Sequence, residues 1–500
     1  MVTSLSLPPY NFFLVNFITF TLFFLFLVKK SNQHKNIKLF FTYGWFFGFG
    51  YFATNLYWIS ISLTFDQNFT FLIPLTTILI PAFISIFYGL VSCFFILLKQ
   101  KRITSSFLIF SVIFGILEFI RGSIFTGFPW NLIVYSFSSQ LEILGIISII
   151  GTYGFNLFCI SLFTSPAVFI LRDTKKDIAV SIFFLITILF FYFYGLSYKQ
   201  KFDLAEKNDY EYKIRIIGSN IGLERFYQNV DSSQVIQDLI KISNPDLEKK
   251  IIFIWPEGIL PGIYQEELKE FNWLFEKKFN ENHLLLIGIN SQSESNGSKN
   301  YYNSITIYDN QLNILDSYNK INLVPFGEFL PFENILRGSG LRSLTNNYQS
   351  FSSGDQRDII EIKRLNFILK ILPLICYEII YSGKLFNNPN FDLIINISED
   401  GWFGKSIGPK QHFVHSIFRA IESGKYLVRS ANNGIAAIVN PLGEIEQSVN
   451  FGQSGYIDLE GSRIIQPTLF SIYGNKIFGL LILLYIFLIF SFNKIKNEQS

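Results

Sequence analysis

Cysteine is scarce in this sequence, with only three among its 500 residues. Cys93 and Cys159 lie inside long apolar stretches, where a cysteine is usually an ordinary apolar side chain. Cys376 is the only cysteine between residues 198 and 470, so that region holds no disulfide partner for it and its thiol is free for chemistry. The three cysteines therefore predict no disulfide framework.

Histidine is nearly as scarce, with four residues in the whole chain. His412 and His415 lie three positions apart in a segment of helical pattern, but no cluster of Cys or Asp accompanies them at the spacing of metal ligands. We therefore predict no metal site. The net charge is also small, at +3, which indicates that nucleic acid is not a partner.

Hydrophobic residues, in contrast, make up 50% of the chain and include 58 Phe, which is too apolar for a soluble protein of this size. They gather in seven uninterrupted stretches, near 11–28, 39–60, 71–98, 106–125, 144–171, 178–197 and 472–492. Each is about long enough to cross a bilayer as a helix, which takes roughly 20 residues. We predict a membrane domain of about six transmembrane helices over 1–197, a polar domain over 198–470, and a C-terminal transmembrane helix with a short tail over 471–500.

Lys and Arg alternate between the loops that join these stretches. The basic loops follow the first, third, fifth and last stretches, with Lys29, Lys30, Lys35, Lys38, Lys99, Lys101, Arg102, Arg172, Lys175, Lys176, Lys494 and Lys496. The loop around 64–70 has neither Lys nor Arg, and the loop after the fourth stretch has only Arg121 at its edge. Because basic loops stay in the cytoplasm, the polar domain is predicted to lie outside. The first stretch lacks a preceding basic region and a small-residue cleavage site, so it is not interpreted as a signal peptide.

The polar domain alternates apolar strands with amphipathic helices, a pattern that predicts a layered α/β fold. The expected strands are 212–219, 251–255, 284–289, 304–308, 365–375, 393–397 and 435–439. The expected helices are 232–242, 265–279 and 411–426.

Three segments of the polar domain lack periodicity. Residues 290–301 are polar and are interpreted as a surface excursion. Residues 334–358 form a long loop with scattered apolar residues, and loops of this length inside a compact domain are usually functional or disordered. We predict that this loop is a lid that touches lipid. Residues 399–409 follow a strand and include Trp402 and Phe403, which are expected to line a cleft.

Three apolar runs of the polar domain end in groups that can do chemistry. One run leads to Glu257, another segment leads to Lys320, and a third ends at Cys376. A thiol is a weak nucleophile until a base takes its proton, and it then forms acyl intermediates readily. Taken singly, each residue has a plain interpretation, since a lone Cys is usually a core residue and a lone Glu or Lys a solvated one. Their joint pattern favours a catalytic site.

These segments also resemble a known family. Trp-Pro-Glu-Gly at 255–258, Asn-Lys…Pro-Phe-Gly-Glu at 319–328 and Cys-Tyr-Glu at 376–378 resemble the Glu-Lys-Cys triad of the nitrilase superfamily. A membrane segment, Glu-Phe-Ile-Arg-Gly…Thr-Gly-Phe-Pro-Trp at 118–130, narrows the resemblance to the apolipoprotein N-acyltransferase family of bacterial membrane enzymes. The resemblance covers nearly the whole chain and implies a four-layer αββα sandwich beside an α-helical transmembrane bundle.

The resemblance also implies roles for residues. Glu257 is expected to be the general base that deprotonates Cys376, and Lys320 to stabilise the oxyanion and the thiolate. The expected supporting residues are Glu328, which orients Lys320 or shares the role of base, Tyr377, whose backbone N–H is an oxyanion donor, Glu378, which accepts hydrogen bonds, and Trp402 and Phe403 at the substrate. Glu118 and Arg121 lie three apart on one helical face, where they can form an ion pair.

The chain departs from the family's pattern at three places. Glu399 stands where the family commonly has Asn, and Phe226 and Tyr227 stand where it usually has Trp. The segment 7–10 resembles the turn after the first of the family's eight membrane helices. This member is therefore expected to lack that helix, unless its sequence begins late.

The expected activity is a two-step exchange in the bacterial inner membrane, with the catalytic domain on the periplasmic side. Cys376 takes an acyl chain from a phospholipid as a thioester, and the α-amine of a diacylated apolipoprotein then takes it from the thiol. No cofactor is expected, because the thioester keeps the energy of the ester. The protein is expected to be a monomer. Two alternatives remain, a membrane-tethered nitrilase-type amidase and a non-catalytic membrane receptor.

Overall fold

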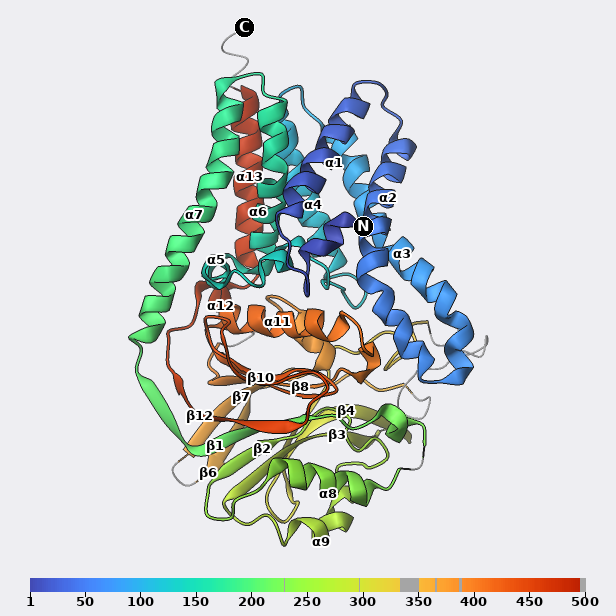
Figure 1. Ribbon diagram of the computed structural model, residues 1–500, viewed down its shortest axis with the longest axis vertical. Coiled ribbons are helices and arrows are strands. Elements are labelled where there is room, and N and C mark those ends of the chain that lie inside the picture. Colours follow the sequence, from blue (N-terminus) through green and yellow to red (C-terminus); the bar gives the residue numbers. More distant parts are fainter. Residues whose placement is uncertain (229, 296, 333–349, 365–366, 386–388, 495–500) are drawn as a thin grey trace.

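The computed structural model describes residues 1–228, 230–295, 297–332, 350–364, 367–385 and 389–494. A bundle of helices forms one end of the molecule and a layered α/β unit forms the other (Figure 1). The chain passes into the α/β unit through α7 (Lys175–Asp203) and returns through α12 (Leu469–Tyr473) to α13 (Lys476–Lys494). The first and last parts of the chain therefore share one bundle.

The remaining long helices of the bundle are α1 (Val15–Ser31), α2 (Ile37–Leu56), α3 (Ile73–Leu98), α4 (Ile103–Arg121) and α6 (Ile147–Ile170). Within the described residues, five helical segments are long and apolar enough to cross a membrane, namely Gln67–Leu98, Ile103–Arg121, Ile147–Ile170, Lys175–Asp203 and Lys476–Asn493. The predicted stretches near 11–28 and 39–60 form α1 and α2, which are not among these five but pack in the same core.

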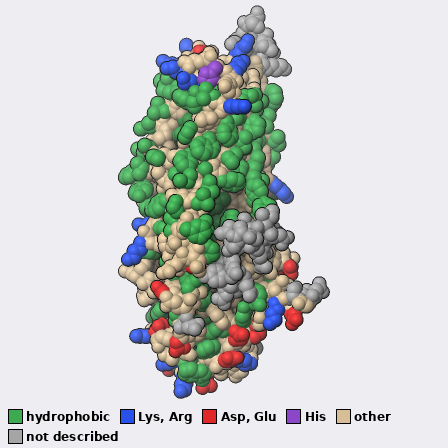
Figure 2. All heavy atoms as spheres, turned by 90° about the vertical axis from the view of Figure 1, so that its right-hand side faces the viewer, with side chains coloured by type: hydrophobic (Ala, Val, Ile, Leu, Met, Phe, Trp, Pro, Cys, Tyr) green, Lys and Arg blue, Asp and Glu red, His purple; other side chains and the backbone are tan. Residues whose placement is uncertain are grey.

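Phenylalanine fills the centre of the bundle. Phe24 of α1 lies 5.3 Å from Phe110 of α4 and 5.5 Å from Phe95 of α3, measured between ring centroids. Such tilted and edge-on pairs let large rings interlock between helices. Figure 2 shows hydrophobic side chains over most of the helical part and Lys and Arg side chains gathered at its end, far from the sheet.

The strands of the α/β unit form one mixed sheet in the order β5-β4-β3-β2-β1-β9-β8-β7-β6, with β12 beside β1, β10 beside β9 and β11 beside β10. Their bounds are β1 (Lys207–Ser219), β2 (Ile251–Ile254), β3 (His283–Ser295), β4 (Ser298–Tyr308), β5 (Ile314–Asn319), β6 (Ile360–Arg364), β7 (Phe367–Ile375), β8 (Leu393–Glu399), β9 (Tyr426–Asn432), β10 (Ala436–Val439), β11 (Ile445–Val449) and β12 (Gly455–Arg463). Strands β1 and β9 pair only through Gly218 with Ala431 and Ser219 with Asn432. The two halves of the sheet are thus joined at the carboxyl ends of these strands.

The sheet folds on itself about this junction. Ile254 and Leu286 of one half share a buried core with Ile371 and Ile395 of the other. Helices α8 (Ser232–Ser243) and α9 (Asn272–Phe275) cover one outer face. Helix α11 (Gly408–Ser423) covers the other outer face and lies between the sheet and the bundle (Figure 1). The αββα sandwich implied by the resemblance is confirmed.

Several expected elements differ from the structure. Most of the helix expected over 265–279 is replaced by two short turns, η6 (Glu267–Phe271) and α9. The helix expected over 411–426 begins earlier, at Gly408, and ends at Ser423, because Gly424 has a φ of +68° and turns the chain into β9. The sequence reading also missed strands β5, β6, β9, β11 and β12.

The prediction of a surface loop over 290–301 is wrong. Residues 290–295 and 298–301 belong to the β3–β4 hairpin, whose register runs through Ser291 and Tyr302 to Ser295 and Ser298. Backbone pairing holds a hairpin together even where its side chains are polar, so composition hid it. Most of the expected lid, namely residues 334–349, lies outside the described residues.

Candidate active site

Three strand ends bring Glu257, Lys320 and Cys376 into one buried site. Glu257 follows β2 by three residues, Lys320 directly follows β5, and Cys376 directly follows β7. The Lys320 ammonium lies 3.2 Å from Oε1 of Glu257 and 2.9 Å from Oε1 of Glu328. Lys320 is 1% exposed. A buried ammonium needs such carboxylate partners, because an unpaired charge in the interior is very costly.

Asn303, in β4, is a site residue that the sequence analysis did not identify. Its side-chain amide donates at 2.7 Å to Oε1 of both Glu257 and Glu328. The second oxygen of Glu257 accepts a hydrogen bond from the backbone N–H of Glu399 at 2.9 Å. Both oxygens of Glu257 are therefore held by donors, and only the pairing of strands brings Asn303 to them.

The charges of the cluster keep Lys320 protonated. Burial alone lowers the pKa of Lys320, but the carboxylates of Glu257 and Glu328 outweigh burial and raise that pKa well above its usual value. Glu328 is tied down as well, since its Oε2 accepts a hydrogen bond from the backbone N–H of Val324 at 2.8 Å. The site therefore presents a fixed positive charge between two fixed carboxylates.

Cys376 occupies an unusual backbone position. Its φ is +48°, in the left-handed region that residues other than glycine rarely adopt. This turn ends β7 and begins the short helix η9 (Cys376–Ile380). Burial and the carboxylate of Glu257 raise the pKa of the Cys376 thiol well above its usual value, against the opposing effect of Lys320. The resting residue is thus a thiol, which needs a base before it can attack.

Glu378 connects the two loops that carry Lys320 and Cys376. Its carboxylate accepts hydrogen bonds from the backbone N–H groups of Ile375 at 2.9 Å, Ile321 at 3.0 Å and Asn322 at 3.1 Å. The guanidinium of Arg357 lies 2.5 Å from the same carboxylate. Glu378 is fully buried, so it fixes these loops from inside the fold.

Tyr377 points towards the helical bundle. Its hydroxyl donates to the carbonyl oxygen of Gly127 at 2.7 Å. The carbonyl of the next residue, Phe128, accepts a hydrogen bond from Arg121, which also forms a buried ion pair with Glu118. The membrane segment noted in the sequence therefore contacts the residue beside Cys376.

Trp402 and Phe403 lie in the turn η10 (Gly401–Phe403), which follows β8. The Trp402 ring lies 5.0 Å from Phe226 and 6.2 Å from Tyr227. The Phe403 ring lies 4.8 Å from Trp58 and 5.8 Å from Trp130, both in the bundle part. Aromatic side chains of both parts of the molecule thus meet beside the site.

A second polar cluster lies behind Cys376. The parallel register pairs Ile375 with Ile397, which places Ser398 opposite Cys376. Ser398 donates to Oδ1 of Asp400 at 2.7 Å, and Asp400 in turn contacts His412 at 2.9 Å. Among the residues that the structure describes, no group of three or more His, Cys, Asp or Glu side chains is placed to hold a metal ion.

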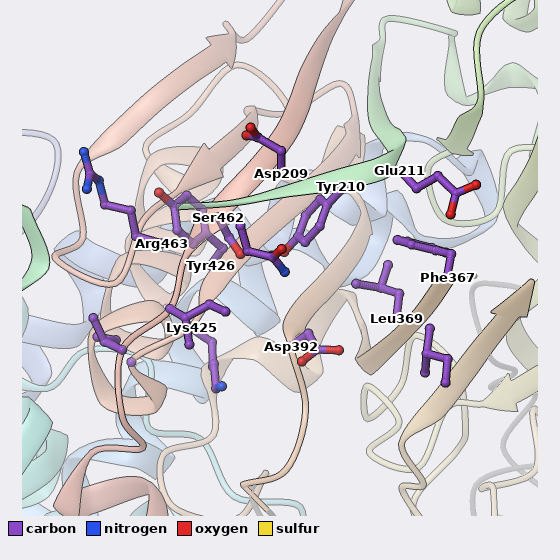
Figure 3. A pocket seen from close by; sticks show the side chains of 15 residues that line it. Asp209, Tyr210, Glu211, Phe367, Leu369, Asp392, Lys425, Tyr426, Ser462 and Arg463 are labelled. Carbon is purple, nitrogen blue, oxygen red and sulfur yellow. The ribbon is translucent and has the colours of Figure 1, made fainter. Parts of the chain in front are cut away.

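A separate cavity of about 330 Å³ lies at the far ends of β1, β7 and β9 (Figure 3). Its lining includes Tyr210, Asp392, Lys425 and Arg463. None of the residues predicted for the site lines it. The cavity is therefore distinct from the cluster around Cys376.

Known proteins resemble the chain over most of its length. The model of the apolipoprotein N-acyltransferase N-terminal domain matches residues 1–165, and the model of the carbon-nitrogen hydrolases matches residues 231–472. Curated proteins named apolipoprotein N-acyltransferase are similar to it. The protein from Rhodopseudomonas palustris is 31% identical, over 98% of this chain and 92% of that protein. The protein from Brucella melitensis is 30% identical, over 91% and 87%. The protein from Rickettsia prowazekii is 33% identical, over 93% and 91%. The chain belongs to the apolipoprotein N-acyltransferase family.

Proposed function

We propose that the protein moves an acyl chain from a phospholipid to the N-terminal α-amine of diacylglyceryl-cysteine in an apolipoprotein. The observation that carries the proposal is the buried cluster of Glu257, Lys320 and Cys376 beside a loop of the helical bundle. Membership of the family supports the two substrate classes. The protein acts as a monomer in the bacterial inner membrane, with the α/β unit on the periplasmic side.

The first half of the reaction forms an acyl-enzyme. Glu257 takes the proton of the Cys376 thiol as the sulfur attacks the ester carbonyl of the phospholipid. The Lys320 ammonium stabilises the negative charge that develops on sulfur and on the carbonyl oxygen. The ester C–O bond then breaks, Glu257 returns the proton to the leaving oxygen, and a lysophospholipid departs.

The second half transfers the acyl chain. The α-amine of the apolipoprotein attacks the thioester carbonyl, and Glu257 accepts the proton that the amine loses. The C–S bond breaks, an amide forms, and the proton returns to the sulfur of Cys376. Neither half needs a metal or a nucleotide, because the thioester keeps the energy of the original ester.

The position of the site supports lipid substrates. Cys376 is followed by Tyr377, whose hydroxyl meets Gly127 of the bundle, and the nearby Phe403 packs against Trp58 and Trp130. An acyl chain could follow these apolar contacts from a bilayer to the thiol. Both lipidated substrates would then react without leaving the membrane.

Intact-mass spectrometry of the purified protein tests the proposal. Incubation with phospholipid should add one acyl chain to Cys376, and later addition of a diacylated lipopeptide should remove it. Cys376→Ala should gain no adduct, whereas Cys93→Ala and Cys159→Ala should gain it as the unchanged protein does. An acyl adduct on the Cys376→Ala protein would refute the mechanism.

The same experiment distinguishes the acyltransferase from the alternative amidase. An amidase of this type would release ammonia from a small amide and would gain no acyl adduct from phospholipid. A receptor would do neither. The apolar rings at the site and the contact of Tyr377 with the bundle favour the acyltransferase, because a small soluble amide needs neither.

A further inference from the structure

Two residues outside the proposed triad, Arg225 and Glu399, form a buried ion pair behind Glu257. Arg225 lies in the turn η5 (Leu223–Phe226) and Glu399 ends β8. Nη2 of Arg225 contacts Oε2 of Glu399, and the two side chains are only 3% and 1% exposed. Removing one member of such a pair leaves the other charge uncompensated in the interior, which is strongly unfavourable. Each charge here therefore depends on its partner.

The pair holds Glu257 from two sides. The backbone N–H of Glu399 donates to Oε2 of Glu257 at 2.9 Å. Arg225 donates from Nε at 3.3 Å and from Nη2 at 3.2 Å to the carbonyl oxygen of Gly258. Gly258 directly follows Glu257 and has a φ of +55°, which glycine adopts without strain. The pair thus joins the ends of β2 and β8 around the carboxylate of Glu257.

The side chain of Glu399 has no freedom left. Its Oε2 also accepts from the amide of Asn432 at 2.6 Å, and its Oε1 accepts from the backbone N–H of Gly401 at 2.8 Å. Burial raises the pKa of Glu399 above its usual value, and the guanidinium of Arg225 opposes that rise. Glu399 therefore brings a buried negative charge that Arg225 neutralises.

Other charged groups also act on this part of the site. Lys320 contacts Glu257 directly, and Glu328 shares both Lys320 and Asn303 with it. Asp400 also acts on the thiol of Cys376, and Arg429 forms a buried ion pair with Asp400. The charge of Arg225 is thus balanced chiefly by Glu399, and the loss of either one changes the charge beside Glu257.

We propose that Arg225 and Glu399 are positioning residues that hold Glu257 in place and balance the charge around it. This inference rests on the proposed function, in which Glu257 takes the proton of Cys376. The pair serves two purposes: its hydrogen bonds fix the backbone on both sides of Glu257, and its opposite charges cancel close to the base. A merely structural pair would serve only the first.

The test measures how alkylation of Cys376 by iodoacetamide depends on pH. This reagent needs no lipid, so the result does not depend on acyl transfer. The full-length protein carries Cys93→Ala and Cys159→Ala, and the carboxamidomethyl adduct is followed by intact mass. The variants are Glu399→Gln, Arg225→Met and the double variant. Arg225→Lys keeps the charge and is the conservative substitution.

Glu399→Gln leaves the positive charge of Arg225 without its carboxylate partner, and this charge favours the thiolate form of Cys376. The midpoint of alkylation should move to lower pH by about half a unit to one unit. Arg225→Met should move the midpoint in the opposite direction by a similar amount. The double variant and Arg225→Lys should both lie close to the unchanged protein.

Arg215→Met is the matched control, because Arg215 forms a similar pair with Asp458 between β1 and β12, away from the site. Its alkylation midpoint should not move. The inference is overturned if both single variants react more slowly without a shift, or if both midpoints move in the same direction. Failure of the unchanged protein to form an acyl adduct with phospholipid would count against the proposed function. The shifts of the alkylation midpoint would still test whether Arg225 and Glu399 balance the charge at the site.

Discussion

At the scale of the residue, the site is a set of buried polar groups whose charges and hydrogen bonds are nearly all matched. Glu257 accepts from Asn303, Lys320 and the backbone of Glu399, and Glu328 accepts from the first two as well. A buried network of this kind is rigid when every member is satisfied, and it loses much when one donor is removed. Single substitutions in it should therefore have large effects.

Asn303→Ala tests the bridging amide. Without its N–H groups, Glu257 and Glu328 each lose a donor while both remain buried, and their orientation towards Lys320 loosens. We expect the rate of acyl-enzyme formation to fall by about 10- to 100-fold, equivalent to roughly 1.4–2.7 kcal/mol in activation free energy. Asn300→Ala, on the same strand, should change the rate less than twofold. Equal losses in both variants would mean that β4 as a whole, and not the amide, matters.

Asp400→Asn tests the cluster behind the thiol through its effect on stability. Burial alone raises the pKa of Asp400, but Arg429 and His412 outweigh burial and hold that pKa well below its usual value. A carboxylate whose pKa is lowered by folding stabilises the folded state at pH values above the pKa that it has in the unfolded chain, which is near 3.9. This stabilisation is lost as the pH falls towards the pKa of the folded state.

The substitution should therefore lower the free energy of unfolding by about 3–5 kcal/mol between pH 5 and pH 8, since it leaves Arg429 unpaired. Thermal unfolding midpoints of the two proteins in detergent at several pH values measure this. The difference between them should shrink only below about pH 4. A difference that shrinks between pH 7 and pH 5 would contradict the assigned cause.

At the scale of the element, a break in a bundle helix connects the two parts of the molecule. Helix α6 is interrupted at Gly151, which has a φ of +67°. The break frees the backbone N–H of Thr152, which donates at 2.8 Å to Oε1 of Glu422 in α11. The same carboxylate oxygen accepts from Ser382 at 2.6 Å. Helix α11 is thus attached to the bundle and to the segment after Cys376 at one point.

Gly151→Ala tests this connection. A Cβ at this position would meet the ring of Phe470 at 2.0 Å, and the positive φ is unfavourable for any side chain. We expect the thermal unfolding midpoint in detergent to fall by several degrees, and the loss of activity to follow the loss of folded protein. Gly479→Ala in α13 is the matched control, because nothing lies within 4 Å of its added Cβ. Equal midpoints for the two variants would show that the break is not required.

At the scale of the whole molecule, α11 belongs to two structures at once. Its residues Phe418 and Ile421 lie in one continuous apolar core with Leu372 and Ile394 of the sheet and with Phe155 of α6. The outer helical layer that α11 forms in the αββα sandwich therefore also packs against the end of the helical bundle (Figure 1). Such a shared core leaves the catalytic unit little freedom to move away from the bundle.

Reporter fusions test the orientation of the molecule in the membrane. Basic residues lie in the loops 29–38, 99–102 and 172–176, which should stay in the cytoplasm by the positive-inside rule. A reporter that is active only in the periplasm should work when fused after Asn310 and should be silent when fused after Lys176. The reverse result would place the α/β unit in the cytoplasm and refute the proposed access to exported apolipoproteins.

The sequence by itself determined the chemical groups and their local positions. Glu257, Lys320 and Cys376 each follow a strand or a strand-like run, and such runs are visible locally because period and composition mark them. The long apolar stretches likewise indicated the helices of the bundle, since about 20 apolar residues in sequence need no partner to be recognised.

Only the tertiary structure decided which of these groups meet. Asn303 reaches Glu257 because β4 and β2 lie in the same half of the sheet, and Arg225 reaches Glu399 because the sheet halves join at β1 and β9. The break at Gly151 likewise goes with a distant contact, between Thr152 and Glu422 of α11. The hairpin of β3 and β4 is different, because its strands are neighbours in sequence and only its polar composition hid it. Contacts between segments far apart in sequence depend on how strands pair and how layers pack. A local pattern of residues predicts neither the strand pairing nor the packing of layers.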